Sequence, residues 1–451
     1  PIPISGFPLE KIPQNHIFMR HICNYYEDIF ANLRLIRKDI PLSDSKERKL
    51  KASRKKAAEL KEYAQEYMQA REEIPTGEKM SDEIARRKSH IIRVLDASEE
   101  DWDDWRWQME NRIRDVETLN EILDLAEGVH EDIETVAGKY RWAVAPYYAA
   151  LMDPNNPDSP IRMQMIPRIE EMAETGVPDF SGEEYTSPVA ALTRWYPDRV
   201  IIRSTNICSS FCRHCLRRRH IGQSDAPTPR EDIEEALDYI RQNPEIRDVL
   251  YTGGDPLTFD DDYLDWLLSE LDAIDHVEIK RIGSRMPFTV PQRITPELCE
   301  MLSRHHPLYI NVQVNHPMEV TAESAEACDM LTRAGVSLGN QTVLLKGIND
   351  DIHVMKLLSH ELLRIRVRPY YIYHCQGTIG IEHLRTRVEK GIEILENLRG
   401  FTSGMAVPDY IITPAGLGKT PLAPEYQISS GEGFLILRNW EGKSYRYDNP
   451  D

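Results

Sequence analysis

The stretch STNICSSFCRHC, residues 204–215, places Cys208, Cys212 and Cys215 at the spacing C-x3-C-x2-C on one short loop. Three thiolates held this closely can ligate three irons of a 4Fe–4S cluster and leave the fourth iron open to a small chelating molecule. A structural zinc site is the alternative, but such sites usually take four ligands. His214 lies between two of the cysteines and is poorly placed to complete a tetrahedron with both. The stretch therefore predicts an iron–sulfur site.

From about Arg199 onward, β-rich runs alternate with amphipathic, helix-like runs. The expected strands are RVIIRST (199–205), DVLYTGG (248–254), VEIKRIGS (277–284), LYINVQV (308–314), SLGNQTVLL (337–345) and RVRPYYIYH (366–374). Repeated strand–helix alternation predicts an α/β fold with a parallel sheet and outer helices, partly closed into a barrel. In such a barrel the chemistry collects at the carboxyl ends of the strands, and the cysteine loop follows the first strand.

A second motif, Gly253-Gly254-Asp255, ends the second expected strand. Glycine lets the backbone approach a ligand closely, so we expect this turn to lie beside whatever the cluster binds. The carbonyl of Gly254 could accept a hydrogen bond from an ammonium group. Alone, such a motif is an ordinary turn, and its position one strand after the cysteine loop gives it meaning.

Changes in composition along the chain suggest four regions. We expect a charged helical extension over 1–95, a helical and wrapping region over 96–190, the barrel over 191–420 and a C-terminal segment over 421–451. Helices are expected around 15–37, through the Lys-, Glu- and Ala-rich stretch from about 43 to 94, and over much of 97–150, where Ser98 can serve as an N-cap. The wrapping part, about 153–188, is rich in proline and polar residues.

Composition excludes several classes of function. The 451 residues carry a net charge of −19, which disfavours nucleic-acid binding because phosphates would be repelled. No run is long and apolar enough to span a membrane, and no secretory signal is recognisable, so we expect a cytoplasmic protein. The seven cysteines are odd in number and only three cluster, which argues against a disulfide framework.

Together these residues resemble the radical S-adenosylmethionine superfamily, and within it the lysine 2,3-aminomutase family. The matching stretches include TRWYPDRV (193–200), CSSFCRHCLRRR (208–219), RDVLYTGGDPL (247–257), VEIKRIGSR (277–285), LGNQTVLLKGIND (338–350), RIRVRPYYIYHC (364–375) and KGIEILENLRGFTSG (390–404). The resemblance covers roughly residues 100–445. It implies a partial (β/α)6 TIM-like barrel and an isomerase that moves an amino group from C2 to C3 of an amino acid.

The resemblance also implies three cofactors: a 4Fe–4S cluster, S-adenosylmethionine and pyridoxal phosphate. Family enzymes carry the pyridoxal phosphate on a lysine in a glycine-rich loop near the C-terminus, and AGLGKT (415–420) lies there, so Lys419 is the expected Schiff-base lysine. A phosphate-binding P-loop is excluded because position 413 would need glycine. A nearby cation and burial would lower the pKa of such a lysine and keep its amine neutral.

Other roles are likewise implied by the resemblance. Arg217 would pair with the substrate carboxylate, Arg199 and Tyr196 would hold pyridoxal phosphate, and Gln341 would face S-adenosylmethionine. Gly253, Gly254 and Asp255 would line the same cofactor site. A reducing partner such as flavodoxin or ferredoxin, and a homo-oligomeric state, are also expected.

The substrate pocket departs from the family pattern. Lysine-specific members place two aspartates against the distal ammonium of the substrate, and the corresponding positions here are Gln376 and Thr413. A buried ammonium without a carboxylate partner would cost several kcal/mol. Lysine is therefore disfavoured, and glutamate or a neutral, amide-like amino acid is favoured.

Two further departures concern the cofactors. A cofactor-binding arginine of the family is replaced by Trp195, and the adjacent Arg194 is a candidate substitute. The C-terminal cysteines that bind structural zinc in lysine enzymes are absent, and their partner position is Asp351. We therefore predict no zinc.

The sequence thus favours a pyridoxal-dependent radical aminomutase acting on a small amino acid. The alternatives are a lysine or arginine 2,3-aminomutase, an enzyme with the same cofactors that ends in elimination or desaturation, and a non-catalytic iron–sulfur or zinc module. Product analysis separates the enzymes from one another.

Overall fold

The structure is a computed structural model that describes residues 46–222, 224–414 and 417–448. The helix expected around 15–37 and Cys23 lie outside these residues. The chain divides into two compact units, one made of the described parts of Pro1–Glu66 and Pro424–Asp451, the other of Tyr67–Ala423. Each unit is described by itself.

The larger unit is organised around a nine-stranded sheet whose strands follow one another in chain order. The strands are β1 (Leu192–Thr193), β2 (Arg199–Thr205), β3 (Asp248–Gly253), β4 (Ile279–Ser284), β5 (Leu308–Val312), β6 (Ser337–Leu344), β7 (Arg368–His374), β8 (Asp409–Ile412) and β9 (Thr420–Leu422). Strands β2 to β8 run parallel, and β1 and β9 add antiparallel edges. The predicted α/β class and all six predicted strands are confirmed, and β8 is a further parallel strand that the sequence pattern did not reveal.

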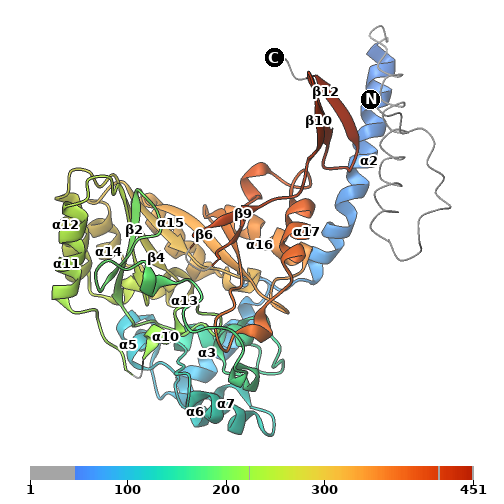
Figure 1. The fold of residues 1–451 in the computed structure, drawn as a ribbon. Helices are drawn as coiled ribbons and strands as arrows, with labels where there is room; N and C mark the ends of the chain where they lie inside the picture. Colours follow the sequence, from blue (N-terminus) through green and yellow to red (C-terminus); the bar gives the residue numbers. More distant parts are fainter. Residues whose placement is uncertain (1–45, 223, 415–416, 449–451) are drawn as a thin grey trace. The chain divides into compact units, whose positions relative to one another are not determined.

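Helices cover the outer face of this sheet (Figure 1). They are α11 (Arg230–Arg241), α12 (Asp261–Asp272), α14 (Pro296–Leu302), α15 (Ala322–Arg333), α16 (Ile352–Arg364) and α17 (Val388–Leu398). In α11 the apolar residues Ile233, Leu237 and Ile240 recur at helical spacing and are fully buried against the sheet. Burial of each such side chain contributes about 1.5–3 kcal/mol. The largest core lies between the sheet and its helices. The ends of the strands therefore stay free for chemistry.

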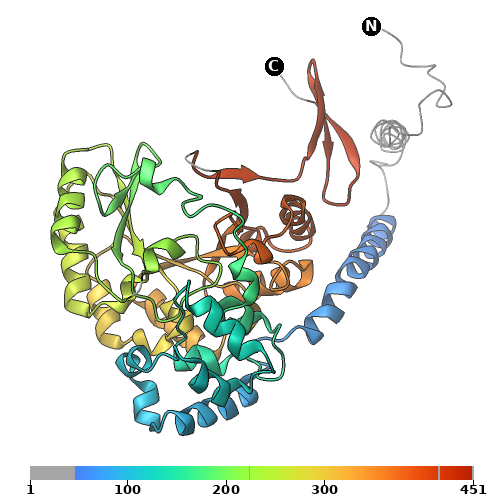
Figure 2. The same cartoon turned by 60° about the horizontal axis from the view of Figure 1, so that its bottom comes forward.

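A layer of short helices lies N-terminal to the sheet and has its own core (Figure 2). It contains α3 (Ser81–Val94), α4 (Glu99–Asp103), α5 (Trp105–Glu110), α6 (Val116–Leu123), α7 (Val129–Ala137), α8 (Pro146–Ala150) and α9 (Pro160–Met165). Ser98 caps α4 through a reciprocal capping box with Asp101, as expected. The helical stretch is nevertheless broken, because Asp104 and Asp115 each accept a backbone hydrogen bond that starts a new helix.

The smaller unit combines the first part of α2 (Lys46–Glu73) with an antiparallel sheet of β10 (Gln427–Gly431), β11 (Phe434–Arg438) and β12 (Ser444–Asp448). Within it, Lys56 pairs with Glu441 at 2.6 Å, and the Tyr63 and Trp440 rings meet edge to face at 5.3 Å. Over the described residues, no helix of either unit is both long enough and apolar enough to cross a bilayer.

Candidate active site

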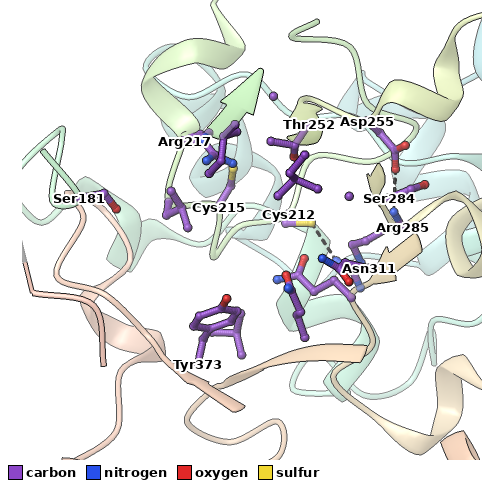
Figure 3. Close-up of a pocket in the computed structure, with 18 of the residues that line it drawn as sticks. Ser181, Cys212, Cys215, Arg217, Thr252, Asp255, Ser284, Arg285, Asn311 and Tyr373 are labelled. Carbon is purple, nitrogen blue, oxygen red and sulfur yellow. Dashed lines mark hydrogen bonds between the residues drawn. The ribbon is translucent and has the colours of Figure 1, made fainter. Parts of the chain in front are cut away.

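One pocket opens at the carboxyl ends of the parallel strands, and most of the residues that the sequence singled out for a site line it. Those residues are Tyr196, Arg199, Cys208, Cys212, Cys215, Arg217, Gly253, Gly254, Asp255, Gln341, Gln376, Thr413 and Lys419. They lie within, just before or just after six strands, β2, β3, β6, β7, β8 and β9. Figure 3 shows part of this pocket, with Cys212, Cys215, Arg217 and Tyr373 around it. The fold therefore brings the cysteine loop and Lys419, which lie far apart in the sequence, into one pocket.

The cysteine loop between β2 and α10 (Arg218–Ile221) is held by the N-terminal helical layer. Arg112 donates to the Cys208 carbonyl at 2.7 Å, and the Arg213 side chain forms a buried ion pair with Glu171 at 2.6 Å. These contacts fix the loop backbone without using the thiols. Burial raises the pKa of Cys215 to about 11, so the thiolate form needs a positive charge such as bound iron.

One cysteine sulfur has a charged neighbour. Arg285, which follows β4, donates from its guanidinium to the sulfur of Cys212 at 2.8 Å (Figure 3). The other side of that guanidinium pairs with the fully buried Glu319 at 2.6 Å. The guanidinium is thus held by Glu319 in a position to donate to a sulfur that would ligate iron.

Gly253, the last residue of β3, and Gly254 after it are required by the protein's own packing. A Cβ on Gly254 would overlap the carbonyl of Ile207 in the cysteine loop, and Gly253 adopts a φ of 122° against Thr205. The turn thus lets the cysteine loop and β3 come together, a different reason from the close ligand approach expected from the sequence. Both glycines still line the pocket.

The third residue of that motif, Asp255, has its carboxylate bonded within the protein. It accepts backbone hydrogen bonds from Leu257 at 3.1 Å and from Arg285 at 2.7 Å. Burial raises its pKa, and these amide donors offset part of that shift. The side chain ties the end of β3 to the end of β4, which holds Arg285 beside the cysteine loop.

Lys419 is placed by the antiparallel pair β8 and β9, which begins with Ile412 opposite Thr420. Thr413 comes directly after β8 and Lys419 directly before β9, so both lie at the same end of the sheet. The Lys419 backbone donates to the Tyr196 hydroxyl at 2.6 Å. Gly418 has a φ of 74° and packs on the Tyr196 ring, which explains why glycine precedes the lysine.

The amine of Lys419 lies among cations. Burial comes first among the causes that lower its pKa from 10.5 to about 8, followed by the guanidiniums of Arg281, Arg199 and Arg217. Arg281 projects from β4 and is itself paired with Asp248 at 2.7 Å. A cation-rich pocket around a lysine suits a ligand that carries both an aldehyde and a phosphate.

The suggested replacement of the missing cofactor arginine by Arg194 is wrong. Its guanidinium contacts Tyr239, Asn243 and Glu245, the last at 2.7 Å, and it does not line the pocket. The backbone alternation after β1 turns residue 194 toward α11 and residue 195 toward the pocket. Arg281 and Arg285 are cations in the pocket that the sequence did not indicate.

The substrate-side residues are also bonded to a common segment. Glu183 forms an ion pair with Arg217 at 2.7 Å, and the hydroxyl of Ser181 donates to the Gln376 side-chain oxygen at 2.9 Å. Burial alone would raise the pKa of Glu183, but Arg217 and neighbouring arginines lower it to about 2. Sequence reasoning missed Ser181 and Glu183, because nothing in a polar, proline-containing stretch indicates which strand ends it contacts.

Buried nitrogen atoms around the pocket fit the cofactors that the sequence implies. Among the described residues Trp195 Nε1 and Arg199 Nε have no hydrogen-bond partner, and both line the pocket near Lys419. His214 Nδ1 and Asn311 Nδ2 are likewise unbonded on the cysteine side. Buried donors normally have partners, so the pocket suits polar ligands at both ends. Cys208, Cys212 and Cys215 are the only cysteines among the described residues that line the pocket, and three thiols suit a cluster with one open iron.

Asp351, at the position associated with zinc in the lysine enzymes, caps α16. Its carboxylate accepts from the His353 and Val354 backbones at 2.8 and 3.0 Å. All six described cysteines are free of disulfides.

Comparison with known proteins matches two family models, the radical SAM superfamily over residues 202–358 and lysine-2,3-aminomutase over residues 395–451. A glutamate 2,3-aminomutase of Clostridioides difficile is 51% identical over 88% of this chain and 94% of its own length. An L-lysine 2,3-aminomutase of Clostridium subterminale is 51% identical over 79% of this chain and 86% of its own. One from Fusobacterium nucleatum is 50% identical over 82% and 87%. Identity alone thus ranks the glutamate and lysine enzymes equally.

Proposed function

The chain belongs to the lysine 2,3-aminomutase family of radical S-adenosylmethionine enzymes, and we propose that within this family it acts on an amino acid whose side chain is not a cation. It is an aminomutase, and therefore an isomerase, that uses a 4Fe–4S cluster, S-adenosylmethionine and pyridoxal phosphate. Glutamate and neutral, amide-bearing amino acids are the favoured substrates.

The distribution of acidic groups around the pocket carries this proposal. Among the described residues that line it, Asp255 alone has a carboxylate, and that carboxylate is already bonded to backbone amides beside the cysteine loop. Gln376 and Thr413 offer neutral polar groups. A lysine ammonium bound here would be desolvated without a counter-ion, which is strongly unfavourable.

We assign the remaining roles on the same geometry. Cys208, Cys212 and Cys215 would hold the cluster, with Gly253, Gly254 and Gln341 beside the S-adenosylmethionine. Tyr196 and Arg199 would hold pyridoxal phosphate near Lys419, and Arg281 adds a cation that suits its phosphate. Arg217 would bind the substrate carboxylate through the part of its guanidinium that Glu183 leaves free.

When bound, the cluster and S-adenosylmethionine supply a carbon-centred radical, and pyridoxal phosphate supplies a π-system through which nitrogen can migrate. The chain's own contribution is orientation and proton control. Burial and nearby guanidiniums place the pKa of Lys419 near 8, so about a tenth of the amine is neutral at pH 7. That neutral fraction is what condensation with the cofactor requires.

The test is an anaerobic assay of the reconstituted holoenzyme with S-adenosylmethionine and a chemical reductant, against glutamate, glutamine, lysine, arginine and uncharged amino acids. The expected result is a β-amino acid from glutamate, glutamine or another amino acid whose side chain is not a cation, formed faster than from lysine or arginine. A clear preference for lysine would overturn the substrate proposal. Release of ammonia without a β-amino acid would indicate elimination in place of migration.

Three further expectations complete the proposal. We propose a flavodoxin or ferredoxin as the physiological reductant, a homo-oligomeric assembly and a cytoplasmic location. The free thiols of the described cysteines suit a reducing compartment.

A further inference from the structure

A segment that precedes β1 in the chain contacts both sides of the substrate pocket. We call residues 176–187, GVPDFSGEEYTS, the strap. At its start Val177 pairs with the chain just after Gln376, donating to the Gly377 carbonyl at 3.0 Å and accepting from Ile379 at 3.1 Å. Gly176 is required there, because a Cβ would overlap the Gly377 carbonyl.

The strap is held on its other side by ion pairs. Glu183, 1% exposed, contacts Arg217 at 2.7 Å and Arg219 at 3.1 Å, both on the chain that follows the cysteine loop. Ser181 lies between these two anchors and is 3% exposed. Its position is therefore determined by contacts at both ends of the strap, and it lines the pocket together with Gln376.

The hydrogen bond between these two residues fixes which end of the Gln376 amide is used. The Ser181 hydroxyl donates to the Gln376 side-chain oxygen at 2.9 Å. An amide carries an acceptor oxygen and two N–H donors, so this bond turns the oxygen toward the strap and uses one of its two lone pairs. No partner for the Gln376 amide nitrogen is found among the described residues, which leaves its donors for whatever enters the pocket.

We infer that Ser181 of the strap is a specificity-determining residue, which orients Gln376 so that the substrate subsite presents donors and selects a side chain with an acceptor oxygen. A carboxamide or a carboxylate, as in glutamine or glutamate, meets this demand. An ammonium group does not, because donor would face donor. An apolar side chain of equal length would cover these donors without pairing them, the kind of mismatch that enzymes discriminate against strongly. This inference rests on the proposed function's non-cationic substrate and names its chemical class.

The test measures binding without radical chemistry. Cluster-containing protein loaded with pyridoxal phosphate is titrated with glutamate, glutamine, norleucine and lysine, and the change in cofactor absorbance gives each Kd. Norleucine matches glutamate in length within about one atom and lacks a side-chain oxygen. The wild-type protein is expected to bind glutamate or glutamine at least tenfold more tightly than norleucine or lysine, about the value of one well-placed hydrogen bond. The glutamate and glutamine titrations decide between carboxylate and carboxamide.

Ser181→Ala is compared with Thr186→Val, a matched loss of a hydroxyl on the same strap. Thr186 donates to the Gly182 carbonyl at 3.1 Å and does not line the pocket. Ser181→Ala is expected to weaken glutamate or glutamine about tenfold, to leave norleucine unchanged and thus to remove the discrimination. Thr186→Val is expected to change neither. Equal weakening of all ligands by Ser181→Ala, or the same loss in Thr186→Val, would show a merely structural hydroxyl and overturn the inference.

Gln376→Glu provides a gain-of-function arm. The Ser181 hydroxyl can still donate to it, and the new carboxylate gives a cation its counter-charge, so lysine binding should tighten while glutamate binding weakens. Unchanged selectivity would also overturn the inference. Failure of the proposed function is separable, because it would appear as tight glutamate or glutamine binding with no β-amino acid formed in the complete reaction.

Discussion

The two sides of the pocket are assembled in different ways. The cysteine side is local: three ligands lie within eight residues, and the turn after β3 and Arg285 after β4 pack directly on their loop. The amino-acid side is long-range, because Lys419, Gln376 and Arg217 come from three distant stretches and are held by Tyr196 and the strap. Radical initiation is thus encoded in a compact motif, and substrate choice in contacts between segments.

The difference indicates where a member of this family can diverge. Changing the cysteine loop would disturb thiols, backbone and Arg285 together. Changing Gln376, Thr413 or Ser181 alters one subsite while Lys419 keeps its contacts. Equal identity to glutamate and lysine enzymes is what this division predicts, since few residues separate their substrates.

The largest effect is expected from Cys212→Ala, which removes one cluster ligand on the cysteine side of the pocket. We expect loss of the 4Fe–4S absorbance and iron content, and loss of all product formation, because two cysteines cannot hold the cluster. Amino-acid binding measured by cofactor absorbance should persist. Cys299→Ala, in a buried thiol outside the pocket, is the control. Retention of a full cluster in Cys212→Ala would contradict the assignment.

Lys419→Ala is expected to disable only the amino-acid side of the pocket. The protein should lose the absorbance of lysine-bound pyridoxal phosphate and its aminomutase activity, while iron content and reductive cleavage of S-adenosylmethionine remain. Lys346→Ala, an exposed lysine outside the pocket, should retain both sets of properties. An unaltered cofactor band in Lys419→Ala would place the Schiff base on a different lysine.

A smaller effect is expected from Arg281→Gln. The change removes a cation and leaves Asp248 unpaired, and both consequences favour the protonated amine of Lys419. Its pKa should therefore rise from about 8, and the midpoint of cofactor loading should shift to higher pH. A rise of one unit makes loading about tenfold slower at pH 7, with recovery at alkaline pH. Arg247→Gln, an exposed arginine on the chain before β3, should leave the profile in place. A downward shift in Arg281→Gln would refute the electrostatic explanation.

The smallest effect is expected from Glu183→Gln, which removes the ion pair between Glu183 and Arg217. The KM for the amino acid should rise severalfold with a smaller change in kcat, because carboxylate orientation is lost while the cofactors stay. The pKa of Glu183 is depressed to about 2, so its stabilising contribution is complete above its ordinary value of 4.5 and is lost as pH falls toward 2. Acid unfolding should show this contribution in the wild type and lack it in Glu183→Gln. Glu184→Gln, at the exposed neighbour, should behave as wild type in both measurements.

Much of this organisation can be predicted from sequence, for identifiable reasons. The six strands of the alternating region are β-rich runs separated by helix-like runs, and the strand-end rule gathers their motifs at one edge. β8 and β9 escaped notice because they are short, yet they place Thr413 and Lys419. Ser181, Glu183 and Arg281 could not be assigned, since each acts through a partner distant in sequence. The sequence predicted close ligand approach as the reason for glycine at position 254. The fold shows a different reason, because a side chain there would overlap the Ile207 carbonyl.

The most direct measurement follows nitrogen itself. Reconstituted enzyme is incubated anaerobically with S-adenosylmethionine, reductant and glutamate or glutamine labelled with ¹³C at C2 and ¹⁵N on the α-amino group, and the reaction is followed by NMR. Migration to C3 predicts that the one-bond coupling between the two labels disappears as a β-amino acid forms, with no labelled ammonia released. Retention of the coupling with both substrates, while labelled lysine loses it, would contradict an aminomutase built for an acceptor side chain.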